Sequence, residues 1–243
     1  MNTKVVLEYD GSGFRGWQEQ AHGRTVEAEL KRALRELTGT EHKVYAAGRT
    51  DAGAHAEGQV VTFETDGRIT PQRLVAALNA RLPKDVSVLA AEVAPDGFHA
   101  RYSARWRRYR YRYLDRRARP ALERDRCWHV GAPLDVAAMS EAARALVGKH
   151  DWTSYCSASE PPAERVREMR SVKVVRRGGF VELELEAEGF LRGLARSIAG
   201  ALAEVGRGRR PAEWVGEVLS ARDRRQAPRT APAGGLTLVE VIY

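Results

Sequence analysis

Hydrophobic positions along residues 3–93 follow a strand period and a helix period in turn. Within one helical stretch, Leu30, Leu34 and Leu37 recur at the spacing of a single helix face. These segments predict strand 3–9, helix 25–38, strand 43–47, strand 58–65, a helix that begins with Thr70-Pro71 and ends at Pro83, and strand 86–93. This β-α-β-β-α-β order is that of a ferredoxin-like unit.

The second half of the chain carries the same kinds of element in a similar order. Residues 107–114 alternate strictly, with tyrosines on one face and arginines on the other, which predicts a strand. The remaining segments predict a strand at 127–130, a helix capped by Asp135, a hairpin of strands 172–175 and 180–187, a long helix from 188 to about 205, a helix at 211–220 and a final strand at 234–241.

These patterns favour an α+β protein with two ferredoxin-like, or RRM-like, halves. Pro95-Asp96-Gly97 interrupts the pattern, and the aromatic and basic stretch 98–105 that follows has no clean period. We therefore predict an N-terminal subdomain of residues 1–97 and a C-terminal subdomain of residues 98–243. The two halves are expected to share a mixed antiparallel sheet, with the functional cleft between them.

Composition places the chain among ordinary globular proteins. Hydrophobic residues make up 43% of it and charged residues 30%. No apolar run approaches the length of a membrane span and no signal peptide is visible, so we expect no membrane association and a cytoplasmic location. The two cysteines, Cys127 and Cys156, are too few for a disulfide framework or a four-ligand zinc site, so no metal site is expected.

The positive charge is concentrated in one stretch. The whole chain carries a formal net charge of +8, and residues 101–130 alone hold eleven arginines against three acidic residues, which is 11 − 3 = +8. Such a stripe is typical of a protein that binds a phosphate backbone, and the alternative is a solvated face of the fold. In the predicted strand 180–187, Glu182, Glu184 and Glu186 alternate with apolar residues, so we expect them to be solvated and to face away from any nucleic acid.

Residues 48–55 form a polar loop between two predicted strands, with the sequence GRTDAGAH. Its glycines permit a sharp turn and the close approach of a ligand to the backbone. Arg49 and Asp51 can both face one ligand, although a structural turn with a surface ion pair would have the same composition. His55 is expected to brace the loop through hydrogen bonds, since a metal site that it formed with His99 would lack further ligands.

Gly11, Gly13 and Gly16 spell the GxGxxG pattern of a dinucleotide-binding loop directly after the first predicted strand. That pattern requires a helix to open at the last glycine, so that the helix N-terminus can hold a pyrophosphate. Here Gly23 interrupts the residues after Gly16, and the helical pattern begins only near Thr25. We therefore expect no nucleotide cofactor.

Several separated blocks of the sequence resemble the tRNA pseudouridine synthase A family. They are Tyr9-Asp10-Gly11 with Gly16-Trp17-Gln18, the loop 48–55, the stretch 98–105 and the stretch 188–196. The resemblance implies that Asp51 is the catalytic aspartate, that Tyr109 contacts the target base and that Arg196 is the active-site basic residue. We expect Arg196 to pair with Asp51, and a local ion pair with Glu188 or Glu204 is the alternative.

The resemblance also implies a substrate and the contacts with it. It implies that the chain modifies uridines 38–40 in the anticodon stem-loop of tRNA, flips the target nucleotide out of its stack and works as a homodimer. The residues expected to contact RNA are Arg49, which would help to hold the flipped nucleotide, and Phe98, His99, Ala100, Arg101, Tyr102 and Arg117.

Pseudouridine formation breaks the N1–C1′ bond of uridine, turns the base and joins C5 to C1′. It needs no redox change, group donor or energy input, so we expect no cofactor. An ionised Asp51 could attack C1′ or initiate proton abstraction, and the sequence leaves both open. Two other functions also stay open. One is a non-catalytic RRM-like RNA-binding protein, and the other is a glycosidase that uses Asp51 with a second carboxylate about 5–10 Å away.

Overall fold

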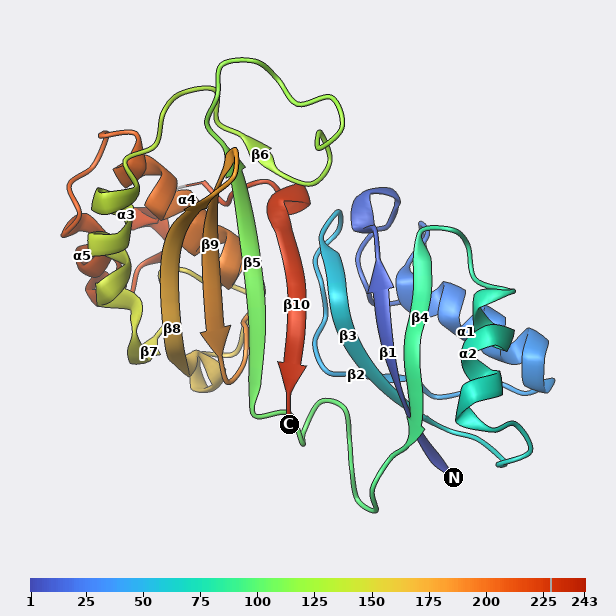
Figure 1. The fold of residues 1–243 in the computed structure, drawn as a ribbon. Coiled ribbons are helices and arrows are strands. Elements are labelled where there is room, and N and C mark those ends of the chain that lie inside the picture. The colour runs from blue at the N-terminus through green and yellow to red at the C-terminus, as the bar shows by residue number, and fades with distance from the viewer. Residues whose placement is uncertain (228) are drawn as a thin grey trace. The chain divides into compact units, whose positions relative to one another are not determined.

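The computed structural model describes residues 1–227 and 229–243 (Figure 1). The chain divides into two compact units: unit 1 comprises Met1–Arg105 with Leu238–Tyr243, and unit 2 comprises Trp106–Thr237. Residues 98–105 fall in unit 1 because Ala100 anchors them there. Its N–H donates to Thr62 Oγ1 at 3.3 Å, and its carbonyl accepts from the Tyr243 hydroxyl at 2.8 Å. The division after residue 97 that we expected from the sequence stays a prediction.

Unit 1 contains the β-α-β-β-α-β order that the sequence predicts, followed by the C-terminal strand. Its elements are β1 (Asn2–Tyr9), α1 (Val26–Thr38), β2 (Tyr45–Ala46), β3 (His55–Glu64), α2 (Pro71–Asn79), β4 (Val86–Val93) and, from Leu238 onward, β10 (Leu236–Ile242). Strand β1 pairs antiparallel with both β3 and β4, and β2 pairs antiparallel with β3. The sheet order in this unit is β4-β1-β3-β10. The prediction is therefore confirmed, although β2 is shorter than expected.

Local sequence signals set the helix ends of unit 1. The Thr25 side chain accepts a hydrogen bond from the Ala28 N–H at 3.4 Å, and Gly39 ends α1 in the left-handed region with φ 75°. Helix α2 begins at Pro71 as predicted, but it ends at Asn79 instead of near Pro83. The Asn79 side chain hydrogen-bonds the backbone N–H and carbonyl of Val88, which fastens the end of α2 to β4.

Unit 2 has the same α+β character. Its elements are β5 (Trp106–Leu114), β6 (Trp128–His129), α3 (Val136–Ala143), β7 (Gly148–Asp151), β8 (Val166–Arg177), β9 (Phe180–Ala187), α4 (Leu194–Gly206) and α5 (Trp214–Ala221). The sheet order β5-β9-β8-β7 is antiparallel throughout, and β6 pairs parallel with β5. Helix α3 packs on β8 and α4, and α4 contacts β5 (Figure 1). The predicted α+β class is confirmed.

Several elements of unit 2 differ from those that the sequence predicts. Strand β8 begins at Val166 instead of residue 172, and helix α5 begins at Trp214 instead of residue 211. Helix α4 begins at Leu194 rather than near residue 188, because Gly193 adopts φ 77° and separates it from the preceding turn. Strand β7 was not predicted at all. Its sequence, GKHD, has no apolar alternation, and it is a strand because it pairs with β8 over residues 166–169.

Strand β5 buries its tyrosine face, as its alternation predicts. Tyr111 and Tyr113 are fully buried, and Tyr109 is 5% exposed. The Tyr111 hydroxyl donates to the Pro232 carbonyl at 2.8 Å, and the Tyr113 hydroxyl donates to the Ala199 carbonyl on α4 at 2.9 Å. The aromatic rings therefore lie on the helix side of the sheet, with their polar ends satisfied.

The opposite face of this sheet carries a layer of arginine–glutamate pairs. Arg108 and Arg170 both bind Glu186, at 2.7 and 2.8 Å, and Arg177 binds Glu182 at 3.2 Å. Only 8% of Glu182 and 9% of Glu186 is exposed, so the expectation that these glutamates are solvated is wrong. Long guanidinium side chains on β5 and β8 flank β9 and cover the carboxylates between them. Part of the basic charge of residues 101–130 is therefore neutralised within the fold.

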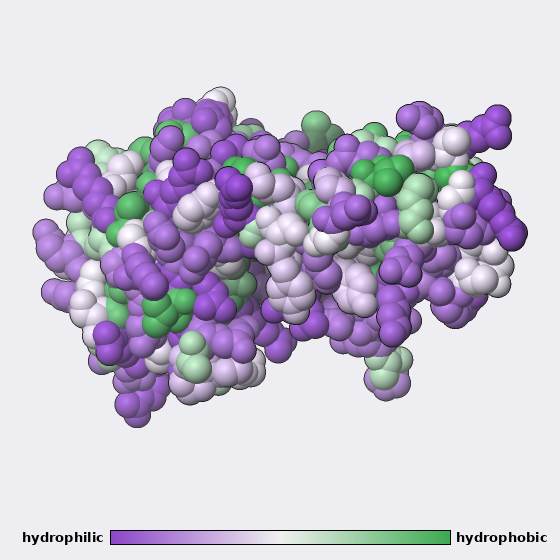
Figure 2. Space-filling view, turned by 90° about the horizontal axis from the view of Figure 1, so that it is seen from below, coloured by the Kyte–Doolittle hydropathy of each residue, from purple (hydrophilic) through white to green (hydrophobic). Residues whose placement is uncertain are grey.

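The surface is largely polar. On the face shown in Figure 2, hydrophilic residues predominate and hydrophobic residues occur in small separate groups. Among residues 1–227 and 229–243, no helix has the length and apolar composition to cross a membrane. A few large apolar side chains are nevertheless well exposed, and Tyr102 is the aromatic one with the highest exposure, at 77%.

Alkaline pH should destabilise the fold through its buried tyrosines. Burial raises the pKa of Tyr9 to about 12, and it also raises the pKa values of Tyr111, Tyr113 and Tyr155. An unfolded tyrosine ionises near pH 10, so each of these groups should lower the unfolding free energy by about 1.4 kcal/mol per pH unit above that value. For Tyr9 this loss should continue until the pH passes about 12.

Urea denaturation between pH 8 and pH 11, followed by phenolate absorbance, tests this prediction. The unfolding free energy should begin to fall near pH 9, because burial also raises the pKa values of Cys127 and Cys156, and it should fall more steeply above pH 10. The buried tyrosines should ionise only as the chain unfolds. Ionisation of all tyrosines near pH 10 in a chain that stays folded would contradict the prediction.

Candidate active site

Residues 48–55, here called the Asp51 turn, connect β2 to β3 as a tight bend. The Ala54 N–H donates to the Asp51 carbonyl at 3.0 Å, and Gly53 has φ 81°, which a residue with a side chain rarely adopts. Asp51 is half-buried and Arg49 is exposed. The turn therefore presents a carboxylate and a guanidinium two residues apart on a fixed backbone.

Two buried side chains of the sheet, Tyr9 on β1 and Gln59 on β3, support the Asp51 turn. The Tyr9 hydroxyl lies 2.8 Å from Thr50 Oγ1, and the Gln59 amide donates to the Gly48 carbonyl at 2.7 Å and to the Tyr9 hydroxyl at 3.4 Å. Tyr9, Thr50 and Gln59 are all buried. Because Gly48 and Thr50 flank Arg49, and Thr50 precedes Asp51, this network fixes the backbone of both candidate residues.

The segment 10–17 packs against the other side of the turn, backbone to backbone. The Trp17 N–H donates to the Thr50 carbonyl at 3.1 Å, and the Gly53 N–H donates to the Phe14 carbonyl at 3.2 Å. A Cβ atom on Gly11 would lie 1.8 Å from the Ala54 carbonyl oxygen, and one on Gly16 would lie 2.7 Å from the Thr50 carbonyl oxygen. These glycines are therefore required by close packing on the Asp51 turn.

The segment does not have the structure of a dinucleotide-binding loop. Gly11–Gly13 form a 3₁₀ turn, and α1 begins only at Val26, so no α-helix opens at Gly16. A phosphate-binding helix N-terminus is thus missing from the place where the GxGxxG pattern requires one.

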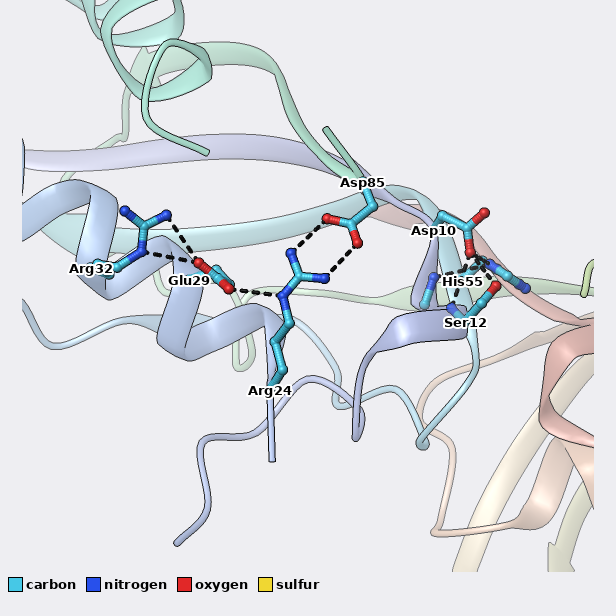
Figure 3. Close-up of polar contacts among 8 residues, drawn as sticks. Asp10, Ser12, Arg24, Glu29, Arg32, His55 and Asp85 are labelled. Carbon is cyan, nitrogen blue, oxygen red and sulfur yellow. Dashed lines mark hydrogen bonds and ion pairs between the residues drawn. The ribbon is translucent and has the colours of Figure 1, made fainter. Parts of the chain in front are cut away.

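His55 braces the turn, as the sequence analysis predicts. Its Nδ1 accepts a hydrogen bond from the Gly11 N–H at 3.1 Å and lies 3.2 Å from Asp10 Oδ1 (Figure 3). The same Asp10 oxygen accepts from the Ser12 N–H at 3.0 Å and from the Ser12 hydroxyl. His55 is buried, so it links segment 10–17 to the start of β3. In the part of the chain that the structure describes, no group of three or more His, Cys, Asp or Glu residues could hold a metal ion.

An ion-pair network that the sequence did not indicate holds the other end of this segment (Figure 3). The Arg24 guanidinium donates two hydrogen bonds to Asp85, at 2.6 and 2.8 Å, and one to Glu29 at 2.8 Å. It also lies 4.2 Å from the centre of the Phe14 ring. Arg32 binds Glu29 from the next turn of α1. No local pattern could have paired Arg24 with Asp85, because these residues meet only through the folding of unit 1.

Two of the predicted catalytic residues belong to unit 2. Tyr109 is buried in β5 with its ring edge-on to Phe190, at a centroid distance of 4.6 Å. Arg196 lies in the first turn of α4, where its Nε donates to the Ala231 carbonyl at 2.8 Å. Asp51 belongs to unit 1, and its pairing with Arg196 stays a prediction.

The two glutamates proposed as local partners of Arg196 face other groups. Arg207 and Arg209 approach Glu204, at 3.7 and 3.3 Å. A carboxylate oxygen of Glu188 accepts from the Glu168 N–H at 3.0 Å. The positive end of the α4 dipole also disfavours a cation in the first turn of the helix. This position therefore favours an anionic partner for Arg196.

The residues predicted to contact RNA differ in their exposure. Arg49, Arg101, Tyr102 and Arg117 are exposed, and Phe98 and His99 are half-buried. Ala100 is fully buried and its N–H and carbonyl are both hydrogen-bonded, so it anchors the 98–105 loop. The structure gives the Ala100 side chain no route to a ligand.

Removing the Tyr9 hydroxyl should lower both the stability of the fold and the rate of catalysis. Tyr9→Phe should lower the unfolding free energy by about 1 to 2 kcal/mol, because Thr50 loses a buried hydrogen bond. It should also lower kcat, because the backbone next to Asp51 loses part of its support.

Tyr155→Phe is the matched control for this variant, since it removes a buried hydrogen bond to the Val215 carbonyl in unit 2. Tyr155→Phe should lower the unfolding free energy by a similar amount and leave kcat unchanged. Denaturation and steady-state kinetics of the two variants test the prediction, and equal kcat values for both would contradict it.

A family model described as tRNA pseudouridine synthase matches residues 5–103 and 142–243, which include Asp51 and Arg196 but not Tyr109. The chain is therefore a pseudouridine synthase, which is an isomerase that modifies RNA. Among solved structures, a chain of a Cbf5-Nop10-Gar1 complex aligns with a TM-score of 0.33 and 12% identity over 82% of this chain and 54% of its own. That likeness is too weak to support an argument.

Curated relatives show which family of pseudouridine synthases the chain belongs to. Proteins named tRNA pseudouridine synthase A are 46% identical in Moorella thermoacetica, over 99% of this chain and 98% of the relative, and 45% identical in Myxococcus xanthus, over 99% and 91%. A third relative with this name, from Xanthomonas euvesicatoria, is 42% identical over 100% of this chain and 95% of its own length. The chain belongs to the tRNA pseudouridine synthase A family.

Proposed function

We propose that this chain converts uridine to pseudouridine in the anticodon stem-loop of tRNA, with Asp51 as the catalytic carboxylate. One observation supports the assignment above the others: Asp51 stands on a turn that is fixed from two sides. Tyr9 and Gln59 hold Thr50 and Gly48 of the turn from the sheet, and the glycines of segment 10–17 pack against its backbone. A catalytic group that must meet one carbon atom of a ribose needs such a rigid support.

The reaction rearranges bonds within one nucleotide. The N1–C1′ bond breaks and its electron pair leaves with the uracil, the base turns, and C5 bonds to C1′. The C5 proton is then lost and N1 is protonated, so atoms and electrons balance without a co-reactant. Asp51 can attack C1′ and form a glycosyl ester, or it can begin the reaction by proton abstraction. Both routes require its carboxylate to be ionised.

The other site residues take roles around this carboxylate. We assign Arg49, which is exposed beside Asp51, to hold the flipped nucleotide through its phosphate. Tyr109 contacts the extracted uracil, and Arg196 pairs with Asp51 and orients its carboxylate. The place of Arg196 in the first turn of α4 supports this pairing, since the helix dipole favours a nearby anion there.

The partners and the location follow from the same proposal. The tRNA is contacted by Phe98, His99, Arg101 and Tyr102 in unit 1 and by Arg117 in unit 2. We also propose a homodimer and a cytoplasmic site of action. The dimer rests on family resemblance, and light scattering tests it: a mass twice that of the chain is expected, and the mass of a single chain would contradict it.

Mapping of pseudouridines tests the substrate assignment. An unmodified tRNA transcript is incubated with the purified chain, and pseudouridines are located by carbodiimide labelling and primer extension. Stops are expected in the anticodon stem-loop, and none are expected in a matched transcript in which cytidines replace the uridines of that arm. Stops elsewhere would contradict the proposed site, and tight tRNA binding without stops would favour a non-catalytic RNA-binding protein.

A further inference from the structure

Three aromatic rings pack in series at the surface of unit 1, here called the stack, with angles of 48° and 36° between neighbouring ring planes. The ring of His99 lies between those of Tyr45 and Tyr102, with centroid distances of 4.8 and 4.5 Å. Both outer rings are exposed, Tyr45 to 47% and Tyr102 to 77%. The Arg101 guanidinium lies 5.6 Å from the centre of the Tyr102 ring. The stack is therefore open to solvent at both ends and carries a cation.

The backbone holds this stack in place before any ligand arrives. His99 Nδ1 accepts hydrogen bonds from the N–H groups of Arg101 and Tyr102, at 3.1 and 3.4 Å. The His99 N–H donates to Ser103 Oγ at 3.0 Å, and the Ser103 N–H donates to the His99 carbonyl at 2.9 Å. Ala100, between them, is anchored to Thr62 and Tyr243. The rings thus stand on a pre-ordered turn, which lowers the entropy cost of binding.

Exposed tyrosines held in a stack suit an unpaired nucleic-acid base. Every base has a π-face, so it extends such a stack without regard to sequence, and an arginine beside the stack can contact the phosphate. No exposed aliphatic side chain belongs to the stack, whose members are two phenols and an imidazole. The Arg101 guanidinium beside the rings, in a chain with a net charge of +8, favours a polyanion as the partner.

The stack and the Asp51 turn lie beside different residues of β3. Tyr45 pairs with Thr62, and Ala100 is anchored to the same residue, whereas the Asp51 turn ends at His55. Residues 55 to 62 of β3 span roughly 23 Å of strand. A base on the stack is therefore a different nucleotide from the one whose ribose meets Asp51.

We propose that Tyr45, His99 and Tyr102 form a base-stacking site for a second, unpaired nucleotide of the tRNA, with Arg101 at its phosphate. This inference rests on the proposed function only in taking tRNA as the ligand. The site adds affinity equally in the ground state and in the transition state, because it does not touch the reacting nucleotide.

Affinity and kinetics of Tyr102→Ala test the site. Fluorescence anisotropy with an unmodified tRNA transcript should show a Kd raised about 5- to 150-fold, the range expected for the loss of one base–aromatic stack. KM should rise by a similar factor while kcat stays at the wild-type value. Tyr45→Ala should act in the same direction, and Tyr102→Phe should restore wild-type binding, because it keeps the ring.

Leu89→Ala is the matched control, since Leu89 is a 48% exposed apolar residue of the same unit outside the stack. Its Kd should equal that of the wild type. If Tyr102→Ala binds tRNA as tightly as this control while the wild type forms pseudouridine, the stacking site is wrong and the proposed function stands. If Tyr102→Ala instead changes self-association and leaves tRNA affinity unchanged, the stack is a protein contact. A wild type that forms no pseudouridine would overturn the proposed function, whatever the variants do.

Discussion

Asp51→Asn should reduce pseudouridine formation by at least about 10³-fold and leave tRNA binding intact. The amide has nearly the shape of the carboxylate, but it can neither attack C1′ nor act as a base. The fold should persist, because the turn is held by backbone hydrogen bonds of Gly53 and Ala54 and by the Tyr9–Thr50 contact. Nucleoside chromatography of the treated tRNA measures the loss, and filter binding measures the affinity.

Asp66→Asn is the control for this loss of charge. Asp66 lies in the same unit with an exposed side chain, and its Oδ1 accepts from the Arg68 N–H, which an asparagine oxygen can also do. This variant should keep the wild-type rate. A rate for Asp51→Asn close to that of Asp66→Asn would remove Asp51 from the chemistry and would require another carboxylate or another mechanism.

Gly11→Ala should have the largest effect on stability of the substitutions considered for unit 1. Its Cβ would lie 1.8 Å from the Ala54 carbonyl oxygen, which is backbone and cannot turn aside as a side chain could. Segment 10–17 and the Asp51 turn would have to separate. We expect a loss of roughly 3 kcal/mol in unfolding free energy, measured by urea denaturation, together with most of the activity.

Gly13→Ala separates this packing effect from a general effect of replacing glycine. Gly13 lies in the same 3₁₀ turn, and the nearest atom to its added Cβ would be Arg24 Nη1 at 3.6 Å, an ordinary contact with a flexible side chain. Its stability should stay within about 1 kcal/mol of the wild type. If Gly11→Ala and Gly13→Ala lose equal unfolding free energy, Gly11 is not required for close packing on the Asp51 turn.

Most of unit 1 could be predicted from the sequence because its signals are local. Thr25 caps α1, Pro71 opens α2, and the strands between them alternate or form short apolar runs. The same is true of the tyrosine face of β5. Each of these features is decided within a few residues of chain, so the period and the capping residue contain the needed information.

The features that were missed depend on neighbours that are distant in sequence. Glu182 and Glu186 have the pattern of a solvated strand face, and only the arginines of adjacent strands bury them. Strand β7 exists because β8 pairs with it. Secondary-structure periods describe one strand at a time, so they do not reveal what covers its polar face.

The candidate site also combines features that local sequence determines with features that depend on residues distant in sequence. The Asp51 turn and the bracing role of His55 could be predicted from one stretch of sequence. The function of Gly11 and Gly16 could not, because these glycines are explained by the carbonyl oxygens of Ala54 and Thr50, which lie far along the chain. Tyr45 was likewise absent from the predicted RNA contacts, since it meets His99 only when β2 pairs with β3.

The release of tritium from uracil C5 tests whether Asp51 catalyses pseudouridine formation, because the joining of C5 to C1′ frees this hydrogen. A tRNA transcript tritiated at C5 of its uridines is incubated with the wild-type chain and, separately, with Asp51→Asn. We expect tritium to pass into water with the wild type and to stay on the tRNA with the variant. No release by a wild-type chain that binds the transcript would contradict the proposed reaction. Equal release by both proteins would contradict the catalytic role of Asp51.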